Sequence, residues 1–187
     1  MRLRIVNSQK EKQFMKHSVR LLVFSALFAA LLAVCAWIAI PIGPVPISLA
    51  TFAVMMCGLL LGWKYGLMAV AAYILLGLAG VPVFAQFRAA SALVGPTGGY
   101  IIGYLPYVLL SGLAIPRLQR AFPGRCLLLV LGTLACYMLG TAWFIHATGR
   151  TLAESLGLCV LPFLPGDAMK ILLAAFLAPR LRKAIKV

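Results

Sequence analysis

The sequence has 187 residues, of which 64% are hydrophobic and 11% are charged. Only three of the charged residues are carboxylates, against 17 lysines and arginines, and the formal net charge is +14. A chain this apolar cannot be an ordinary soluble domain. The charge does not indicate nucleic-acid binding, because no nucleic-acid motif or aromatic-interleaved basic patch accompanies it. We therefore expect an all-α integral membrane protein embedded in a lipid bilayer, with no nucleic acid among its partners.

Proline and glycine clusters divide the apolar runs into helices of about membrane-spanning length, roughly 20 residues each. A basic tail at residues 1–18 precedes a six-helix transmembrane domain at residues 19–182, and residues 183–187 form a second short tail. The helices are expected at Val19–Ile40, Ile47–Leu61, from the Gly62–Gly66 break to Leu78, Tyr100–Leu118, Leu127–His146 and Pro165–Leu181. The connection Ala79–Gly99 is too apolar for a solvated loop, so we expect it to fold back against the bundle.

Six spans place both termini on the same side of the membrane. Nearly all the basic residues then fall on that side, and only Arg88 and Arg150 fall on the other. The positive-inside rule predicts that both termini are cytoplasmic. The segment Pro41–Pro46, the connection Ala79–Gly99 and the start of the last helix then lie together on the outer side. Irregular backbone at membrane depth is tolerated where it lines a cavity, so we expect an outward-facing ligand pocket.

Asp167 is the most unusual residue, because it lies in the apolar segment PFLPGDAMK (Pro162–Lys170). An ionised group inside a membrane helix costs roughly 2.5–3.5 kcal/mol on insertion scales. Lys170 follows three residues later and therefore shares the same helix face. The two side chains either form a self-neutralising structural pair or make a polar floor for a small ligand. In the second case Asp167 accepts N–H groups and Lys170 donates to a carbonyl or carboxylate.

Four further residues are candidates for the same pocket, each with a simpler structural explanation. Arg88 either meets a ligand carboxylate bidentately or sits in water or at a headgroup. In GPTGGY, Thr97 is a candidate helix N-cap and Gly98 permits close approach of backbone or ligand, although the motif also suits a plain helix entry. Trp143 belongs either to an interfacial aromatic belt or to the pocket.

Enzymatic chemistry finds little support in the sequence. There are two histidines, His17 and His146, and Asp167 has no second carboxylate beside it within a span. The five cysteines lack metal-ligand spacing and are expected to be buried hydrophobes, so no metal or cofactor is predicted. Any ATPase that drives transport must lie on another chain.

Small residues recur at four-residue spacing on the first helix. Ala26 and Ala30 form one such pair, and Ala29 and Ala33 form another. Such faces let helices approach closely in lipid, which would suit an intramembrane partner helix.

With these residues in place, the chain resembles the BioY family, the biotin-specific substrate-binding (S) components of energy-coupling factor (ECF) transporters. The resemblance covers about Leu22–Ala184, and it is carried by PVPISLATFAV (Pro44–Val54), GLAGVPVFA (Gly77–Ala85), GPTGGYIIGY (Gly95–Tyr104), GTAW (Gly140–Trp143) and PFLPGDAMK. One departure is Ala50, where the family pattern leads us to expect a glutamine.

The resemblance implies a six-helix bundle in the cell membrane that binds biotin and works with a transmembrane coupling protein and a pair of ATPases. Asp167 and Lys170 would anchor the ureido ring, Arg88 or a loop N–H would meet the carboxylate, and small residues on the first helix would contact the coupling protein. The predicted substrate-binding residues are Asp167, Lys170, Arg88, Thr97, Gly98, Tyr100, Phe84, Phe52 and Trp143, and the predicted coupling residues are Ala26 and Ala30. Biotin would be a transported substrate, not a cofactor.

Other functional classes stay open. A stand-alone, possibly proton-coupled transporter of a small carboxylate or vitamin would use Asp167 as its proton site. An integral-membrane enzyme and a structural scaffold are weaker alternatives.

Overall fold

The computed structural model describes residues 2–113 and 116–185, with the side chains of residues 18–113 and 118–184. The described part is mostly helical, apart from one short antiparallel hairpin in which Ala39 pairs with Ser48 and Ile40 with Ile47. The elements are α1 (Arg2–Trp37), β1 (Ala39–Ile40), β2 (Ile47–Ser48), α2 (Ala50–Leu78), a 3-10 turn η1 (Ala85–Phe87), α3 (Ser91–Val94), α4 (Gly98–Ser111), α5 (Pro116–Arg120), α6 (Phe122–Thr148), α7 (Leu152–Cys159) and α8 (Leu164–Ile185).

Helix α2 consists of two arms that meet at Gly62. Gly62 has φ 74° and ψ 177°, a backbone conformation that only glycine adopts easily. The amide of Trp63 donates to the carbonyl of Gly112 (3.0 Å), which ties the break to the end of α4. A Cβ on Gly112 would overlap the Gly62–Trp63 backbone, so close packing holds the two segments together. The predicted break between the second and third helices is therefore confirmed and falls at Gly62.

Several predicted helix boundaries were wrong, and the first helix begins at Arg2 instead of Val19. Helix α1 ends at Trp37 and not at Ile40, because residues 39–48 form the hairpin. The expected helix Tyr100–Leu118 divides into α4 and the short α5. Helix α6 begins at Phe122, earlier than Leu127, and Pro123 suits a helix start because its missing N–H has no intrahelical partner there.

The expected helices leave residues 147–164 as a connection, but within it the structure has the helix α7. Its first turn is closed by a capping box, in which the Thr151 side chain accepts from the amide of Glu154 and the Glu154 carboxylate accepts from the amide of Thr151. Helices α7 and α8 are bent by 52° relative to each other.

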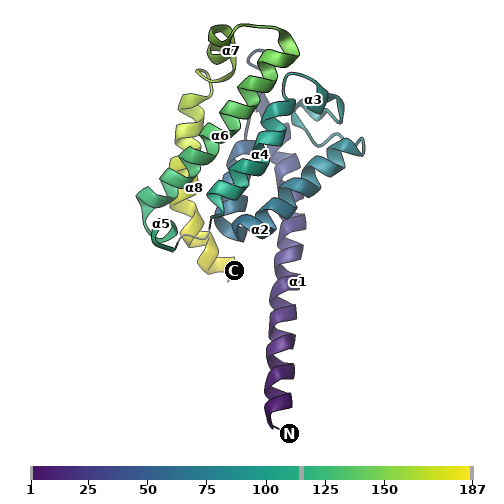
Figure 1. The fold of residues 1–187 in the computed structure, drawn as a ribbon, viewed down its shortest axis with the longest axis vertical. Helices are drawn as coiled ribbons and strands as arrows, with labels where there is room; N and C mark the ends of the chain where they lie inside the picture. The colour runs from purple at the N-terminus through teal and green to yellow at the C-terminus, as the bar shows by residue number, and fades with distance from the viewer. Residues whose placement is uncertain (1, 114–115, 186–187) are drawn as a thin grey trace.

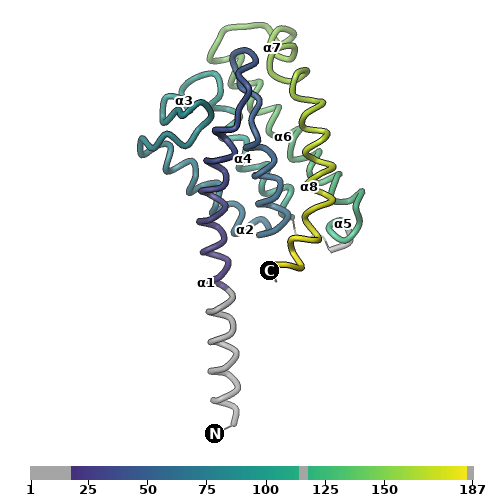
Figure 2. The backbone as a smooth tube through the Cα atoms, turned by 180° about the vertical axis from the view of Figure 1, so that it is seen from behind, coloured from purple at the N-terminus to yellow at the C-terminus, as the bar shows by residue number. Residues whose placement is uncertain are grey.

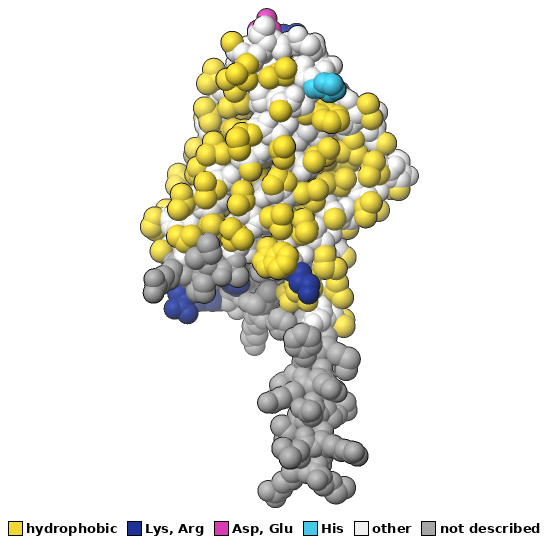
Figure 3. Space-filling model, in the orientation of Figure 1, with side chains coloured by type: hydrophobic (Ala, Val, Ile, Leu, Met, Phe, Trp, Pro, Cys, Tyr) yellow, Lys and Arg dark blue, Asp and Glu magenta, His cyan; other side chains and the backbone are white. Residues whose placement is uncertain are grey.

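The long helices run side by side, and the irregular segments gather at one end of the bundle (Figures 1 and 2). The β1–β2 hairpin and α7 lie at the upper end in Figure 1, while α5, the break in α2 and the end of α8 lie at the lower end. Hydrophobic side chains cover the face between the two ends, and basic side chains gather at the lower end (Figure 3). This distribution is typical of a protein surrounded by lipid tails.

The number of membrane spans stays a prediction. By length and composition, the described residues contain three helices able to cross a membrane, Ser18–Trp37, α2 and α6, or four if the bent pair α7–α8 counts as one span. Helix α4 is apolar but shorter.

Candidate ligand-binding site

Asp167 and Lys170 form a buried ion pair in the first turns of α8. Lys170 Nζ lies 2.9 Å from Asp167 Oδ1, and the two residues are only 9% and 3% exposed. The prediction that Asp167 and Lys170 are neighbours on one helix face is confirmed. Lys170 also donates to the Ser48 carbonyl (2.8 Å) and to Thr51 Oγ1 (3.0 Å), so all three of its N–H donors have acceptors.

The Asp167 carboxylate is held by two other helices as well. The Tyr137 hydroxyl on α6 donates to Oδ2 (2.7 Å), and the Thr51 hydroxyl at the start of α2 donates to Oδ1 (3.3 Å). Hydrogen bonds to an ionised acceptor are stronger than neutral ones. The pair is therefore the centre of a network that joins α2, α6, α8 and the hairpin.

Two small cavities meet beside this network. They share Val45, Pro46 and Ser48 of the hairpin and Tyr100 and Tyr104 of α4. Each encloses about 40 Å³, which is room for a few water molecules. The first, called here the charged lobe, is also lined by Thr51, Cys136, Tyr137, Phe163, Asp167 and Lys170.

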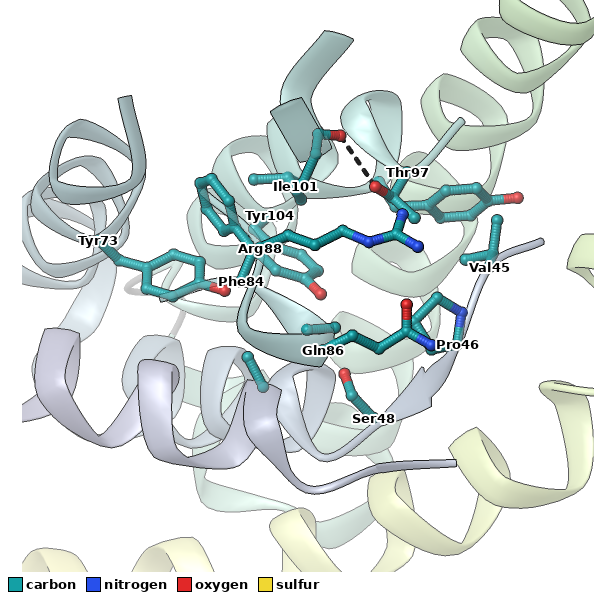
Figure 4. Close-up of a pocket in the computed structure, with 14 residues that line it drawn as sticks. Val45, Pro46, Ser48, Tyr73, Phe84, Gln86, Arg88, Thr97, Ile101 and Tyr104 are labelled. Carbon is teal, nitrogen blue, oxygen red and sulfur yellow. Dashed lines mark hydrogen bonds between the residues drawn. The ribbon is translucent and has the colours of Figure 1, made fainter. Parts of the chain in front are cut away.

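The second cavity, called here the arginine lobe, lies under the connection between α2 and α4. Arg88, Gln86 and Thr97 bring polar groups to it, and Figure 4 shows the Arg88 and Gln86 side chains crossing the opening. Phe84 and Tyr73 form its apolar wall and pack edge to face, with ring centroids 5.2 Å apart. The charged lobe thus offers a carboxylate and an ammonium, and the neighbouring arginine lobe offers a guanidinium.

The connection is folded back against the bundle, as expected. Trp37 Nε1 on α1 donates to the Pro82 carbonyl (2.9 Å), and the Trp37 ring stacks on Phe87 at 5.1 Å. Gln86 and Phe87 have φ values of 60° and 56°, which are unusual for residues with a side chain. Backbone strain of this kind often accompanies functional turns.

The remaining predicted residues divide into two groups. Tyr100 lines both lobes, and Phe84 and Thr97 line the arginine lobe. The Thr97 hydroxyl does not cap α4, however; it donates to the Ala92 carbonyl (2.8 Å, Figure 4). Phe52, Gly98 and Trp143 do not line either lobe.

Packing explains where these three residues lie. Phe52 faces an apolar groove outside the bundle, beside Met169 and Phe176 of α8. Trp143 donates from Nε1 to the Gly95 carbonyl (3.0 Å), which holds the loop before α4. A Cβ on Gly98 would overlap the Leu93 carbonyl, so this glycine is required for close packing.

Sequence reasoning missed Ser48, Thr51 and Tyr137, and it gave no weight to Tyr104. A signal existed for Thr51 and Tyr137, because a hydroxyl in a charge-free apolar run needs an acceptor. Ala50, where a glutamine was expected, is buried, and in the sequence it lies between the network residues Ser48 and Thr51.

The two alanine pairs on α1 differ in exposure although they lie close together around the helix. Ala29 and Ala33 are buried in the core, whereas Ala26 and Ala30 are exposed. In the part of the chain that the structure describes, no group of three His, Cys, Asp or Glu residues could hold a metal ion.

These features define a helical membrane protein with an enclosed polar site between irregular segments at one end of the bundle. The fold closely matches a solved structure described as the S-component for biotin from an ECF-type ABC transporter, with a TM-score of 0.83 and 34% identity over 90% of this chain and 93% of that chain. The "Biotin transporter BioY" of Thermotoga maritima is 39% identical over 88% of this chain and 97% of its own length. The "Probable biotin transporter BioY" of Pyrococcus horikoshii is 40% identical over 84% of this chain and 93% of its own length. The BioY family model matches residues 8–187, and the chain belongs to that family.

Proposed function

We propose that this chain is the biotin-binding component of a vitamin uptake transporter, without catalytic activity of its own. The observation that carries the proposal is the buried Asp167–Lys170 pair lining one cavity, beside a second cavity that Arg88 lines. The identity of the proposed ligand comes from the similar proteins, which are described as a biotin transporter and as an S-component for biotin.

Biotin fits the chemistry of the two lobes. Its ureido ring has two N–H donors and one carbonyl acceptor, which complement a carboxylate and an ammonium side by side. In this structure Lys170 donates to the Ser48 carbonyl, and the ureido carbonyl would take the place of that acceptor. The carboxylate of the ligand would reach Arg88 in the arginine lobe, with Tyr100 beside the apolar rings. A site that pairs buried polar groups rejects analogues lacking them.

The cavities are too small for biotin as they stand. Ligand pockets have volumes of about 300–1,000 Å³, and each lobe has about 40 Å³. The hairpin segment Val45–Ser48 walls both lobes and is held over the charged pair by the Lys170–Ser48 hydrogen bond. We propose that this segment moves outward on binding, which joins the lobes into one pocket.

The membrane arrangement extends the proposal. If each arm of α2 crosses the membrane, then α1, the two arms, α4, α6 and α8 give six spans in the cell membrane. Both termini are then cytoplasmic, which agrees with the basic side chains at the lower end in Figure 3. The pocket faces outside. The exposed Ala26–Ala30 face would meet a transmembrane coupling protein, and ATPase subunits would supply the energy.

Calorimetric titration of biotin into the purified chain tests the proposal. We expect wild-type protein to bind, and Asp167→Asn and Lys170→Ala to lose at least tenfold in affinity, because a hydrogen bond to a charged group contributes about 1.5–3 kcal/mol. Glu154→Gln is the matched control, because this carboxylate is exposed on α7. Folded wild-type protein that does not bind biotin would refute the ligand. Uptake by vesicles holding this chain alone, abolished by an uncoupler, would support the proton-coupled alternative.

A further inference from the structure

A third cavity lies at the opposite end of the bundle from the ligand site. It is lined by Gln119 of α5, Arg125 near the start of α6, Arg182 near the end of α8, and the apolar residues Leu59, Ala178 and Pro179. Its volume is about 50 Å³. In Figure 1 this is the lower end of the molecule, where the apolar belt of Figure 3 gives way to basic side chains.

Arg125 is a buried cation that the protein satisfies only in part. It is 9% exposed, yet it carries a full charge. Its Nε donates to the Ala175 carbonyl (2.8 Å), and Nη1 donates to the carbonyls of Gln119 (2.8 Å) and Arg120 (3.0 Å). Its Nη2 donates to no described atom. Every fully buried side-chain nitrogen or oxygen among the described residues has a partner, so Nη2 keeps an accessible side, and the cavity that Arg125 lines is the opening beside it.

Arg182 brings a second guanidinium to the same cavity. Its Nη1 donates to Gln119 Oε1 (3.1 Å), which holds the side chain across the opening. The other nitrogens of Arg182 donate to no described atom. Two guanidinium groups lining one small cavity supply the kind of N–H donors with which arginine binds an oxyanion.

The chain cannot supply the counter-charge from its described residues. It has three carboxylate side chains, Glu11, Glu154 and Asp167. Glu154 caps α7 at the other end of the bundle, and Asp167 is paired with Lys170. The side chain of Glu11 lies outside the described part. A buried charge without a partner is costly, so an anion from outside the chain would stabilise this end of the protein.

We propose that the Arg125–Arg182 cavity binds a phosphate group, supplied by the headgroup of an anionic phospholipid. Its position between helix ends, where the apolar surface stops, is the depth at which headgroup phosphates lie, and basic pockets between membrane helices bind such headgroups. Free inorganic phosphate offers the same chemistry, and the experiment separates the two sources.

The experiment uses the purified, delipidated full chain in mild detergent. Phosphatidylglycerol, phosphatidylcholine or inorganic phosphate is added at matched ionic strength, and native mass spectrometry and thermal unfolding measure retention and stabilisation. We expect selective retention of phosphatidylglycerol, with about tenfold weaker binding to Arg182→Gln, because a charge-assisted contact is lost. Arg180→Gln is the matched control, because Arg180 is exposed, stacks on Phe176 at 3.6 Å and does not line the cavity.

Each outcome decides the proposal. Stabilisation by inorganic phosphate alone, lost in Arg182→Gln and kept in Arg180→Gln, would support the phosphate site and identify the free ion as its source. Equal losses of binding in Arg182→Gln and Arg180→Gln would refute the site, since the general positive charge of the surface would explain such losses. No effect of phosphatidylglycerol or phosphate on wild-type protein would also refute it. Arg125→Lys keeps the charge but loses the planar guanidinium with its paired N–H groups. This variant should weaken retention of phosphatidylglycerol without abolishing biotin binding.

Discussion

At the scale of single residues, the Asp167 carboxylate is held by one partner on its own helix and by two from distant parts of the chain. Its carboxylate accepts hydrogen bonds from Lys170, Thr51 and Tyr137. An isolated carboxylate in an apolar interior would be expensive, and this network offsets that cost. The same network fixes the direction in which the carboxylate presents its oxygens to the charged lobe.

Replacing Tyr137 with phenylalanine tests this network. We expect the unfolding free energy in mixed micelles to fall by about 1.5–3 kcal/mol, because the lost bond has a charged acceptor. Tyr107→Phe is the matched control: its hydroxyl lies 2.8 Å from Thr133 Oγ1 in a neutral pair, and interhelical pairs of this kind average about 0.6 kcal/mol in membrane proteins. Equal losses in the two variants would show that the charge of Asp167 adds nothing to the bond.

The sequence predicted the local part of the site and missed the rest for a physical reason. Asp167 and Lys170 are three residues apart, so helix periodicity alone makes them neighbours. Thr51 lies 116 positions from Asp167, and no periodic pattern connects them. Phe52 and Trp143 were assigned to the pocket as aromatic residues near it, but which helix face they occupy depends on how α2 and α6 rotate against their neighbours.

At the scale of elements, glycines allow α4 and α6 to pack closely. A Cβ on Gly132 would overlap the Tyr107 ring, and one on Gly140 would overlap the Tyr100 ring. Small residues at helix contacts are typical of membrane proteins, because backbones can then approach closely. Tyr100 thereby gains its place between the two lobes.

Gly140→Ala should therefore disturb both stability and binding. We expect a loss of about 1–3 kcal/mol in unfolding free energy from overpacking, together with weaker biotin binding as the Tyr100 ring is displaced. Gly157→Ala on α7 is the control, since a Cβ there meets nothing within 4 Å. A Gly140→Ala protein with wild-type stability would show that α4 and α6 separate easily. Thermal unfolding and calorimetry measure the two effects.

The long helices could be predicted from the sequence, whereas helix ends and the short helix α7 could not. The break at Gly62 was visible because a glycine pair flanks a short polar stretch. The early end of α1 was not visible, since nothing in the run up to Ile40 shows that residues 39–48 pair as a hairpin. Helix α7 was missed because it is only eight residues long, although Thr151 and Glu154 carry the capping-box spacing.

At the scale of the whole molecule, the hairpin and α7 lie at one end, and basic side chains gather at the other (Figures 1 and 3). The proposed topology follows from this separation. Arg150→Cys and Lys183→Cys, both at exposed positions, test it in intact cells with a membrane-impermeant maleimide. We expect labelling at position 150 and none at 183 until the cells are opened. The unsubstituted chain is the control, because its described cysteines are buried or half-buried. Labelling at 183 in intact cells would invert the topology.

The exposed Ala26–Ala30 face gives a second test at this scale. Ala30→Leu adds bulk where a partner helix is proposed to approach, so uptake by cells containing the transport module should fall at least tenfold while biotin binding by the purified chain is unchanged. Ala142→Leu, at an exposed position on α6, should leave both unchanged. Unimpaired uptake with Ala30→Leu would exclude this face as the contact.

The bonds from Lys170 to Ser48 and from Asp167 to Thr51 join residues 122 and 116 positions apart. A ribosome adding about 5–20 residues per second needs on the order of ten seconds to pass from Thr51 to Asp167. During that time the first part of the protein waits in the membrane without the charges that the Ser48 carbonyl and the Thr51 hydroxyl will contact. A chain that stops short of Asp167 lacks both anchors of the proposed site, so under this proposal incomplete products of synthesis would not withhold the vitamin from finished transporters.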